Sequence, residues 1–500
     1  MLPAREPGLP PPHFRRSLEP HKKSFGGSLM KLKTTSLLKK NTLDDYLDAA
    51  IGAARWIQSL EVKEKVGKTW KIFPDGQNGY KDNPFVGKTS FYAGSAGIGF
   101  FFLRLYQVTS DEQWLDEAKA AAEYILANPR GLEFYRKVQK RIASTKKNSA
   151  PECNAAGPVN GWSFSYKVGP ISEGQFVYAL YRETNDNRYY EFAIRTANTF
   201  VEAAIEDENG LRWSDFRDIV GDAGGIVYLL QVYKDTRKKI YLETAKKAGA
   251  YIEKFGRPAK NGGTYYNLYD LESVGEGEKG AVHVNFSHGS AGTAYLWAAL
   301  YEATKDKHYL KLADDVIKYL EGIAVGDKTS VLFPYQDHPE KGPLDKFYLG
   351  MCGGPIGASL PFKKLYELTH DEKYLQWVKR LYAGLVKAGV PEIKSWGYWG
   401  SKCICCGGPG ALEYFATLYK TYGDAQYLKL AHRSADVLLG ESFEEETGLS
   451  WYGAWDRVNP SRIVSYTGFY IGAAGVAGSL LKLIAAEKHI QIAEFFEYYL

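Results

Sequence analysis

The chain has 500 residues, 45% of them hydrophobic and 14% aromatic, which is ample for a large apolar core. Its apolar runs, such as IGFFFLRLY at 98–106, are too short to span a bilayer. No charged start followed by an apolar stretch marks a secretory signal. We therefore expect a cytoplasmic protein without a membrane span. The cysteines number five, an odd count, so we do not expect a disulfide framework, and any clustered cysteines are predicted to serve in metal binding or catalysis.

The net charge of +5 is concentrated at the N-terminus. Residues 1–40 contain nine Lys and Arg against two acidic residues, together with the stretches PGLPPPHF and SFGGS. This composition predicts a disordered basic tail over 1–41. The rest of the chain is close to neutral, so nucleic acid is not an expected partner.

The first predicted helix covers 42–60. It opens with a Thr-x-x-Asp capping signature at Thr42 and Asp45. Its apolar residues then recur at steps of three and four, at Leu43, Leu47, Ala50, Ala54 and Ile57. Such a stripe is typical of a helix that packs against a core on one side only.

A repeated pattern organises the chain after this helix. It is clearest in YAGSAGIGFFFLRLYQVTSDEQWL (92–115), SHGSAGTAYLWAALYEATKDKHYL (287–310), CGGPIGASLPFKKLYELTHDEKYL (352–375) and CCGGPGALEYFATLYKTYGDAQYL (405–428). Each copy has a G-x-x-G, an apolar helix, a Thr/Asp turn and the start of an amphipathic helix. Weaker copies near Gly169, at 220–242 and at 470–483 bring the number to seven. An aspartate is predicted to cap the second helix of most copies, at Asp111, Asp186, Asp306, Asp371 and Asp424.

The order of the helices predicts a closed ring. The chain starts on an amphipathic, outer helix and stops soon after an apolar, inner one, so the first outer helix would pair with the last inner helix. An open array would instead need polar capping repeats, and none is seen. We therefore expect one all-α domain over 42–500, an α/α toroid of seven inner and seven outer helices. The glycines before each inner helix are expected to allow tight turns and close backbone approach.

Alignment of the copies brings the cysteines together. Cys352 and Cys405 fall two residues before the first glycine of their copies, and Cys406 and His288 fall one residue before it. All inner helices of a toroid begin at the same end of the ring, so Cys352, Cys405 and Cys406 should meet there. Three protein ligands and a vacant position are typical of catalytic zinc. Cys403 as a fourth ligand would instead give a closed, structural site, and Cys153 is expected to be an unligated thiol.

With this repeat, SHGSAG at 287–292 and the Cys-Cys-Gly at 405–407, the sequence resembles the lanthionine cyclase (LanC-like) family, in its variant with a Cys-Cys-Gly zinc motif. The resemblance covers roughly 43–500. It implies one Zn²⁺ held by Cys352, Cys405 and Cys406. It also implies that a peptide cysteine thiol is added to dehydroalanine or dehydrobutyrine, which closes a lanthionine or methyllanthionine thioether ring. By the same resemblance His288 would move the proton during addition, and Asp218 would face the site.

The sequence departs from the family pattern at three places. The more usual Cys-His-Gly is replaced by Cys-Cys-Gly, and the places that often hold Arg and Tyr around the first cysteine hold Tyr348 and Gly353. Zinc with three thiolates carries a charge of −1 and, with a substrate thiolate added, −2. The bound sulfur should therefore keep more electron density and be a better nucleophile.

The expected partner is a dehydrated, Cys-containing precursor peptide with a leader. A tail of about 42 residues cannot hold a dehydration domain, so a separate dehydratase is expected. Two other classes stay open. One is a non-catalytic, zinc-stabilised scaffold that binds a peptide or glutathione. The other is an α/α-toroid glycoside hydrolase or sugar epimerase with paired carboxylates in an aromatic-lined mouth, for which SWGYWG (395–400) would be suited.

Overall fold

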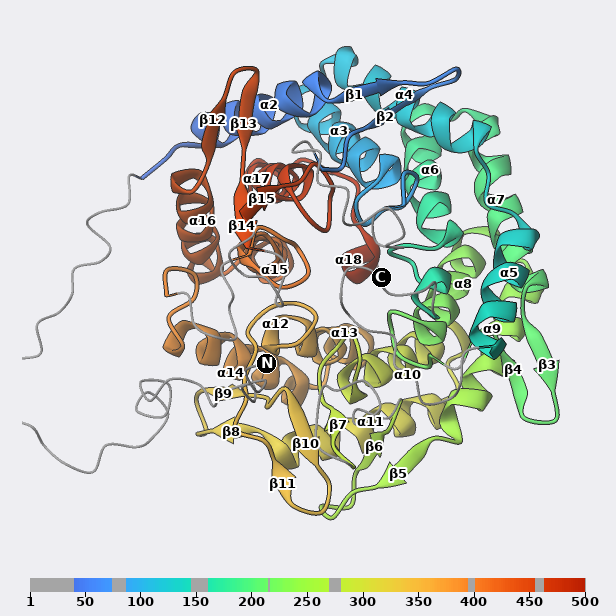
Figure 1. The fold of residues 1–500 in the computed structure, drawn as a ribbon. Helices are drawn as coiled ribbons and strands as arrows, with labels where there is room; N and C mark the ends of the chain where they lie inside the picture. The colour runs from blue at the N-terminus through green and yellow to red at the C-terminus, as the bar shows by residue number, and fades with distance from the viewer. Residues whose placement is uncertain are drawn as a thin grey trace, which may run out of the picture.

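The protein is a closed ring of helices in two layers (Figure 1). The computed structural model describes residues 40–73, 87–144, 161–214, 216–268, 280–393, 401–454 and 463–499. In these residues seven inner helical segments surround the axis: α3 (Ser95–Thr109), α6 (Pro170–Thr184), α8 (Asp222–Thr236), α10 (Ser290–Thr304), α12 and α13 (Pro355–Ala358 and Leu360–Thr369, one segment interrupted at Ser359), α15 (Gly408–Tyr422) and α17 (Ala473–Glu487). The α/α toroid expected from the sequence is confirmed.

Seven outer helices cover the inner ones: α2 (Leu43–Ser59), α4 (Glu112–Ala127), α7 (Asn187–Glu202), α9 (Lys239–Glu253), α11 (Lys307–Ile323), α14 (Glu372–Lys387) and α16 (Ala425–Gly440). Each inner helix packs on the outer helix that follows it, except that α17 packs on α2, the first helix of the ring. The closure is tied by Asp436 of α16, whose Oδ1 accepts hydrogen bonds from Tyr46 Oη (2.7 Å) and the Asn41 backbone N–H (3.0 Å). First and last units therefore meet as the helix order predicts.

Burial follows the two helix types. Every residue of α10 from Ser290 to Leu300 is buried, because this helix contacts neighbours on all sides. In α11 the buried residues recur on one face only, at Tyr309, Ala313, Val316, Ile317, Tyr319 and Leu320. A helix that is apolar all round belongs inside, and one with a single apolar stripe belongs at the surface.

The turns between inner and outer helices repeat one capping geometry. Inner helices end in a residue with a left-handed backbone, for example Asn185 at φ 55° and Lys305 at φ 60°. The residue directly after it is an aspartate whose carboxylate accepts the backbone N–H two residues further on. The sequence predicts these caps at Asp111, Asp186, Asp306, Asp371 and Asp424. At α9 the cap is Lys238, which makes no side-chain cap, and this is the copy in which the turn pattern is blurred.

The second glycine of each G-x-x-G is needed for space. A Cβ at Gly410 would lie 2.0 Å from the carbonyl oxygen of Ile404, and one at Gly475 would lie 1.8 Å from that of Phe469. In each case the loop before the helix folds back over its first turn. The glycines are therefore structural, as the sequence analysis expects for most of them.

Short antiparallel hairpins, which the sequence analysis did not predict, follow five of the seven outer helices in the described residues. They are β1 (Glu61–Lys63) with β2 (Lys68–Trp70), β3 (Ile205–Asp207) with β4 (Gly210–Arg212), β5 (Gly256–Pro258) with β6 (Thr264–Tyr266), β8 (Val325–Gly326) with β9 (Val331–Leu332), and β12 (Phe443–Glu445) with β13 (Gly448–Ser450). Strands of two or three residues are too short to show an alternating pattern.

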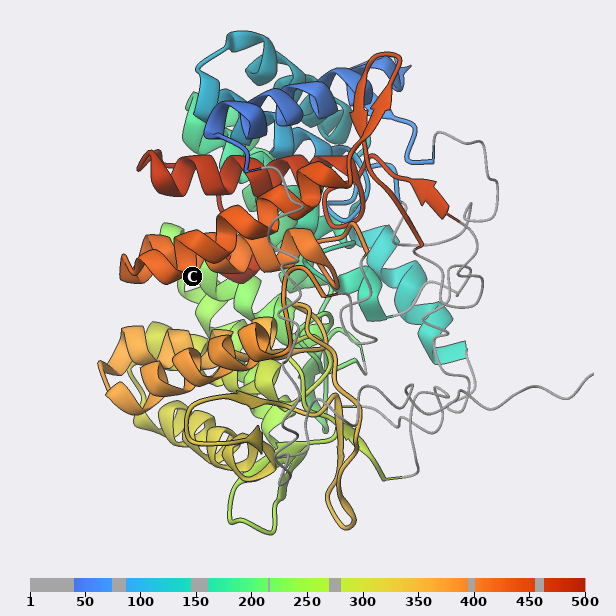
Figure 2. The same cartoon turned by 90° about the vertical axis from the view of Figure 1, so that its left-hand side faces the viewer.

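The remaining elements lie mostly in the long connections, on the side that Figure 2 shows at the right, where the inner helices begin. They are α5 (Leu132–Ser144), the 3₁₀ turn η3 (Gly161–Phe164), the pair β14 (Tyr452–Ala454) and β15 (Ile463–Ser465), and a three-stranded sheet in the order β11 (Gly342–Pro343), β10 (Gln336–His338), β7 (Val282–His283). The basic tail over 1–39, Cys153 and the SWGYWG stretch lie outside the described residues. Among those described, no helix combines the length and apolarity that a membrane crossing requires.

The C-terminal segment, residues 491–499, runs inside the ring and ends in α18 (Phe496–Tyr499), which Figure 1 shows at the centre. Buried Arg104 donates to the carbonyl oxygen of Ala493 (2.8 Å) and pairs with Glu413 (2.5 Å), and Lys482 pairs with Glu494. Nearer the helix starts, the Phe496 ring stacks on Tyr166 with centroids 3.5 Å apart. The segment therefore packs against the inner helices inside the toroid.

We expect Gly475→Ala to lower the free energy of unfolding by about 2 kcal/mol or more, because the added methyl group would overlap a backbone carbonyl that cannot withdraw without moving the loop. Denaturant unfolding followed by circular dichroism measures the change. Gly131→Ala is the control, since nothing lies within 4 Å of a Cβ at that position. Equal stability of the two variants would contradict the steric role.

Candidate metal and catalytic site

Backbone hydrogen bonds join the loops that lead into neighbouring inner helices. Each residue that takes part in these bonds stands two positions before the first glycine of its repeat unit, except Ile404, which stands three positions before it. The bonds run from Tyr92 N to Lys167 O (2.8 Å), Tyr470 N to Tyr92 O (2.9 Å), Ile404 N to Tyr470 O (3.0 Å), Cys352 N to Cys405 O (2.9 Å) and Ser287 N to Cys352 O (3.2 Å). We call this the mouth belt. It brings equivalent positions of distant units side by side.

Three cysteines meet on the mouth belt. The Sγ of Cys352 lies 3.0 Å from that of Cys406, which lies 3.6 Å from that of Cys405. All three sulfurs lie within 4.8 Å of one another. Cys352 comes from the loop before α12, and the other two come from the loop before α15. The convergence follows from the repeat, because Cys352 and Cys405, 53 residues apart in sequence, occupy equivalent places in adjacent units and Cys406 is the next residue.

Cys403 is held apart from this cluster. Its sulfur accepts a hydrogen bond from the Cys406 backbone N–H (3.2 Å) and lies 3.1 Å from Ser401 Oγ. The residue is buried, and its backbone forms an isolated bridge with Ile471. Within the described residues, the group of side chains close enough to share a metal contains Cys352, Cys405 and Cys406 without Cys403.

The donor set suits a thiophilic metal ion. Three sulfurs at this spacing can share one ion, and thiolate ligands favour metals such as zinc. Hydrogen bonds from Cys352 and Cys406 lower the pKa of Cys405 well below its usual range, and Lys167 and His288 act in the same direction. The cluster therefore already favours one thiolate before a metal binds.

His288, which is partly exposed, pairs with buried Asp218 next to the cysteines. Nδ1 of His288 lies 2.8 Å from Oδ2 of Asp218, which comes from the loop before α8 and is 1% exposed. His288 follows Ser287, whose N–H donates to Cys352. A carboxylate on Nδ1 fixes the orientation and the tautomer of the imidazole. The structure thus brings together all five residues named from the sequence.

Sequence reasoning did not single out Asn285 and Tyr335, which lie in the contacts around this pair. The side chain of Asn285 accepts the backbone N–H of His288 (2.9 Å), and its amide lies 3.3 Å from Nδ1 of His283. The rings of His283 and Tyr335 have centroids 4.8 Å apart, and Tyr335 packs in turn on Tyr348 (4.3 Å). Asn285 shows no signal in the repeat, because it stands in the loop whose length and composition differ between copies.

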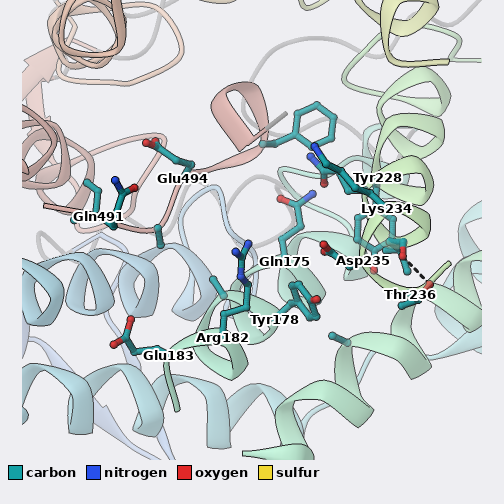
Figure 3. A pocket seen from close by; sticks show the side chains of 18 of the residues that line it. Gln175, Tyr178, Arg182, Glu183, Tyr228, Lys234, Asp235, Thr236, Gln491 and Glu494 are labelled. Atoms are coloured by element: carbon teal, nitrogen blue, oxygen red, sulfur yellow. Dashed lines mark hydrogen bonds between the residues drawn. The ribbon is translucent and has the colours of Figure 1, made fainter. Parts of the chain in front are cut away.

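A cavity of about 640 Å³ lies away from the cysteines. It is lined by residues 174–183 of α6, the second half of α8, part of α7 and residues of the C-terminal segment. Figure 3 shows the side chains of Gln175, Tyr178 and Arg182 on one side and Glu494 on another. Its lining contains no cysteine. It is therefore separate from the cluster on the mouth belt.

Comparison with known proteins places the chain in a family. The family model described as "Lanthionine synthetase C-like protein" matches residues 86–495. The protein belongs to this LanC-like family, as its resemblance in sequence implies. No curated protein sequence matches the chain.

The fold was also compared with those of solved structures. Nisin cyclase is similar with a TM-score of 0.56 and 16% sequence identity, over 81% of this chain and 90% of that protein. Two others have lower scores: an α-1,6-mannanase from Salegentibacter sp. (TM-score 0.42, 14% identity, 71% and 98% covered) and a cellobiose 2-epimerase from Bacillus thermoamylovorans (0.44, 16%, 74% and 99%). At these identities the likeness to nisin cyclase establishes the toroid fold.

The amount of bound metal in two variants distinguishes an open site with three sulfur ligands from a closed site with four. Cys352→Ala should abolish tight binding of Zn²⁺, because the loop before α12 contributes only this sulfur to the cluster. Cys403→Ser should keep the ion, because a hydroxyl can still accept the Cys406 N–H. Elemental analysis after dialysis measures both. Equal loss of metal from the two variants would show that Cys403 is a ligand.

Proposed function

We propose that the protein is a zinc-dependent lanthipeptide cyclase, which adds peptide cysteine thiols to dehydroalanine or dehydrobutyrine and so forms lanthionine or methyllanthionine rings. The observation that supports it most is the meeting of Cys352, Cys405 and Cys406 beside the His288–Asp218 pair. Membership in the LanC-like family supports the same reaction. Here the Cys-Cys-Gly at 405–407 would be the zinc variant of the family motif.

Cys352, Cys405 and Cys406 would hold the zinc, with Cys403 kept as a hydrogen-bond acceptor outside the ligand set. Zinc bound there would lower the pKa of an incoming peptide thiol, so that it reacts as a thiolate near neutral pH. The mouth belt would fix the three sulfurs before substrate arrives, which limits reorganisation during the reaction.

His288 would act as the general acid. The substrate sulfur forms a bond to the β-carbon, the carbon–carbon π bond breaks, and the electron pair is left on the α-carbon and carbonyl oxygen as an enolate. A proton on Nε2 of His288 would then go to the α-carbon, since Nδ1 is engaged by Asp218. The thiol proton lost at the start balances the one delivered, so no cosubstrate is consumed.

Asp218 would be the positioning residue of this step. Its buried carboxylate holds the imidazole in one orientation. The substrate would be a dehydrated precursor peptide with its leader, supplied by a separate dehydratase. A reducing compartment such as the cytoplasm fits the reaction, because Cys352, Cys403, Cys405 and Cys406 are all free.

The direct test is incubation of the zinc-loaded protein with a dehydrated, Cys-containing peptide. Ring formation consumes a thiol without changing the peptide mass, so alkylation after the reaction should add no label, and fragmentation should show a protected ring. Cys352→Ala is the inactive control. Zinc retention with no thiol loss across varied peptides would favour the non-catalytic scaffold, and a zinc-free protein would favour a sugar enzyme.

His288→Asn should lower the rate of cyclisation about 10²- to 10⁴-fold while leaving bound zinc unchanged, because it removes the proton donor and no ligand. Asp218→Asn should give a smaller loss, because the imidazole stays in the site but loses the carboxylate that orients it. His308→Asn is the matched control, since His308 pairs with Glu253 on the outer surface at 3.1 Å. Full activity in His288→Asn would remove His288 from the mechanism.

A further inference from the structure

The cavity between α6, α8 and the C-terminal segment has no part in the proposed reaction. Its volume of about 640 Å³ lies within the range of roughly 300–1,000 Å³ that is typical of ligand sites. It runs beside the C-terminal segment, as Figure 3 shows for Gln491 and Glu494. Voids larger than a water molecule are few in a packed domain, so a hollow of this size is a candidate binding site.

Two glutamines in the lining of the cavity have amides without a hydrogen-bond partner. Gln231 of α8 is 6% exposed, and Gln175 of α6 is half-buried. The amide nitrogens of both are buried and make no hydrogen bond within the described residues. Unpaired buried amides are costly and rare in native proteins. Because the last torsion of a glutamine side chain is broad, both amides can turn towards a ligand in the cavity.

The charged side chains of the lining balance one another. Lys420 pairs with Glu494 at 3.2 Å, and Lys234 pairs with Glu302 at 3.4 Å. A lining without net charge favours an uncharged polar ligand over an anion such as a nucleotide. The charged residues that line the cavity are three basic and three acidic ones: Arg182, Lys234, Lys420, Glu183, Asp235 and Glu494.

The wall of the cavity shows which uncharged group the interior of the ring already binds. Ala493, which lines the cavity, belongs to no helix or strand, and side chains of α3 bind both polar groups of its backbone. Its N–H donates to the side-chain oxygen of Gln107 (2.7 Å), and its carbonyl oxygen accepts from Nε of Arg104 (2.8 Å). A glutamine and an arginine thus bind non-helical peptide backbone here.

The C-terminal segment is anchored, so the cavity exists before a ligand arrives. The carboxylate of Glu497 accepts hydrogen bonds from the hydroxyls of Tyr166 (2.9 Å) and Tyr470 (2.6 Å), and Nζ of Lys167 lies 3.2 Å from it. Phe496, which lines the cavity, stacks on Tyr166. Binding to such a preformed site needs little ordering of the protein.

We infer that the cavity binds an uncharged, non-helical peptide segment, with the amides of Gln175 and Gln231 bonded to its backbone. These glutamines and Arg182 are of the same side-chain types that bind Ala493. Figure 3 shows Gln175 and Arg182 directed into the hollow. A carboxamide suits peptide backbone, because both offer N–H donors and a carbonyl acceptor. The inference does not depend on the proposed function.

The test uses the capped peptide acetyl-Ala-Ser-Ala-Ser-amide, which has no charge and no thiol, and full-length protein. Saturation-transfer NMR should show weak binding at millimolar concentration, with or without zinc. Gln231→Leu should weaken the binding about fivefold, as expected for the loss of one hydrogen bond. Ala179→Trp should abolish it, because the indole would occupy space in the cavity that Ala179 lines.

Thermal unfolding gives a second measurement, on the protein without ligand. Gln231→Leu should raise the melting temperature, because it replaces an unpaired buried amide with an apolar group of similar size. Gln58→Leu is the matched control, since Gln58 donates to Glu117 (3.0 Å) outside the cavity lining. This variant should melt no higher than the wild type and keep the affinity for the probe. If Gln231→Leu loses helical circular dichroism, Gln175→Leu takes its place in both measurements.

Four results would overturn the inference. They are absence of probe binding, binding that Ala179→Trp leaves intact, binding that is lost when zinc is removed, and a lower melting temperature in Gln231→Leu, which would show that ordered water already pairs the amide. Equal binding of an uncharged sugar such as maltose, with the same response to the variants, would overturn the assignment to a peptide. A protein that closes rings without binding the probe would keep the proposed function, and one that binds the probe without closing rings would keep this inference.

Discussion

Closure of the ring is the constraint on which the rest of the structure depends. Because α17 packs on α2, all seven loops that lead into the inner helices face one axis, and backbone hydrogen bonds join five neighbouring pairs of them in the mouth belt. Residues that are hundreds of positions apart in sequence thereby become neighbours. The cysteine cluster needs no separate domain, since one repeat position, varied from unit to unit as Tyr92, Lys167, Cys352 and Cys405, places two of its three cysteines on the mouth belt.

Much of the fold and of the cysteine cluster could be predicted from the sequence, because the features involved are local or repeated. Aspartate caps, glycines beneath folded-back loops and apolar or striped helices each depend on a few neighbouring residues. The meeting of Cys352 with Cys405 and Cys406 needed one further step, the combination of the repeat with a closed ring. The two-residue and three-residue strands could not be predicted, since they are too short to show an alternation of apolar and polar residues.

The supporting contacts of the site escaped prediction for a different reason. Glu497 lies outside every repeat, so no alignment relates it to Lys167 or Tyr470. Asp218 and His288 were named separately, but their 2.8 Å contact depends on how far two loops of unlike length extend over the mouth. Lys167 did carry a signal, its place two residues before Gly169, although its unit lacks the second glycine of the pattern.

The position of α17 also sets an order of events during synthesis. A chain emerging from a ribosome exposes Cys352, Cys405 and Cys406 before residues 473–487 are available to seal the ring, and the segment that carries Glu497 comes later still. Contacts of such long range form slowly. The thiols of the nascent chain are thus open to oxidation or to stray metal until its last helices dock, so the cell's thiol-reducing capacity should govern how much competent protein accumulates.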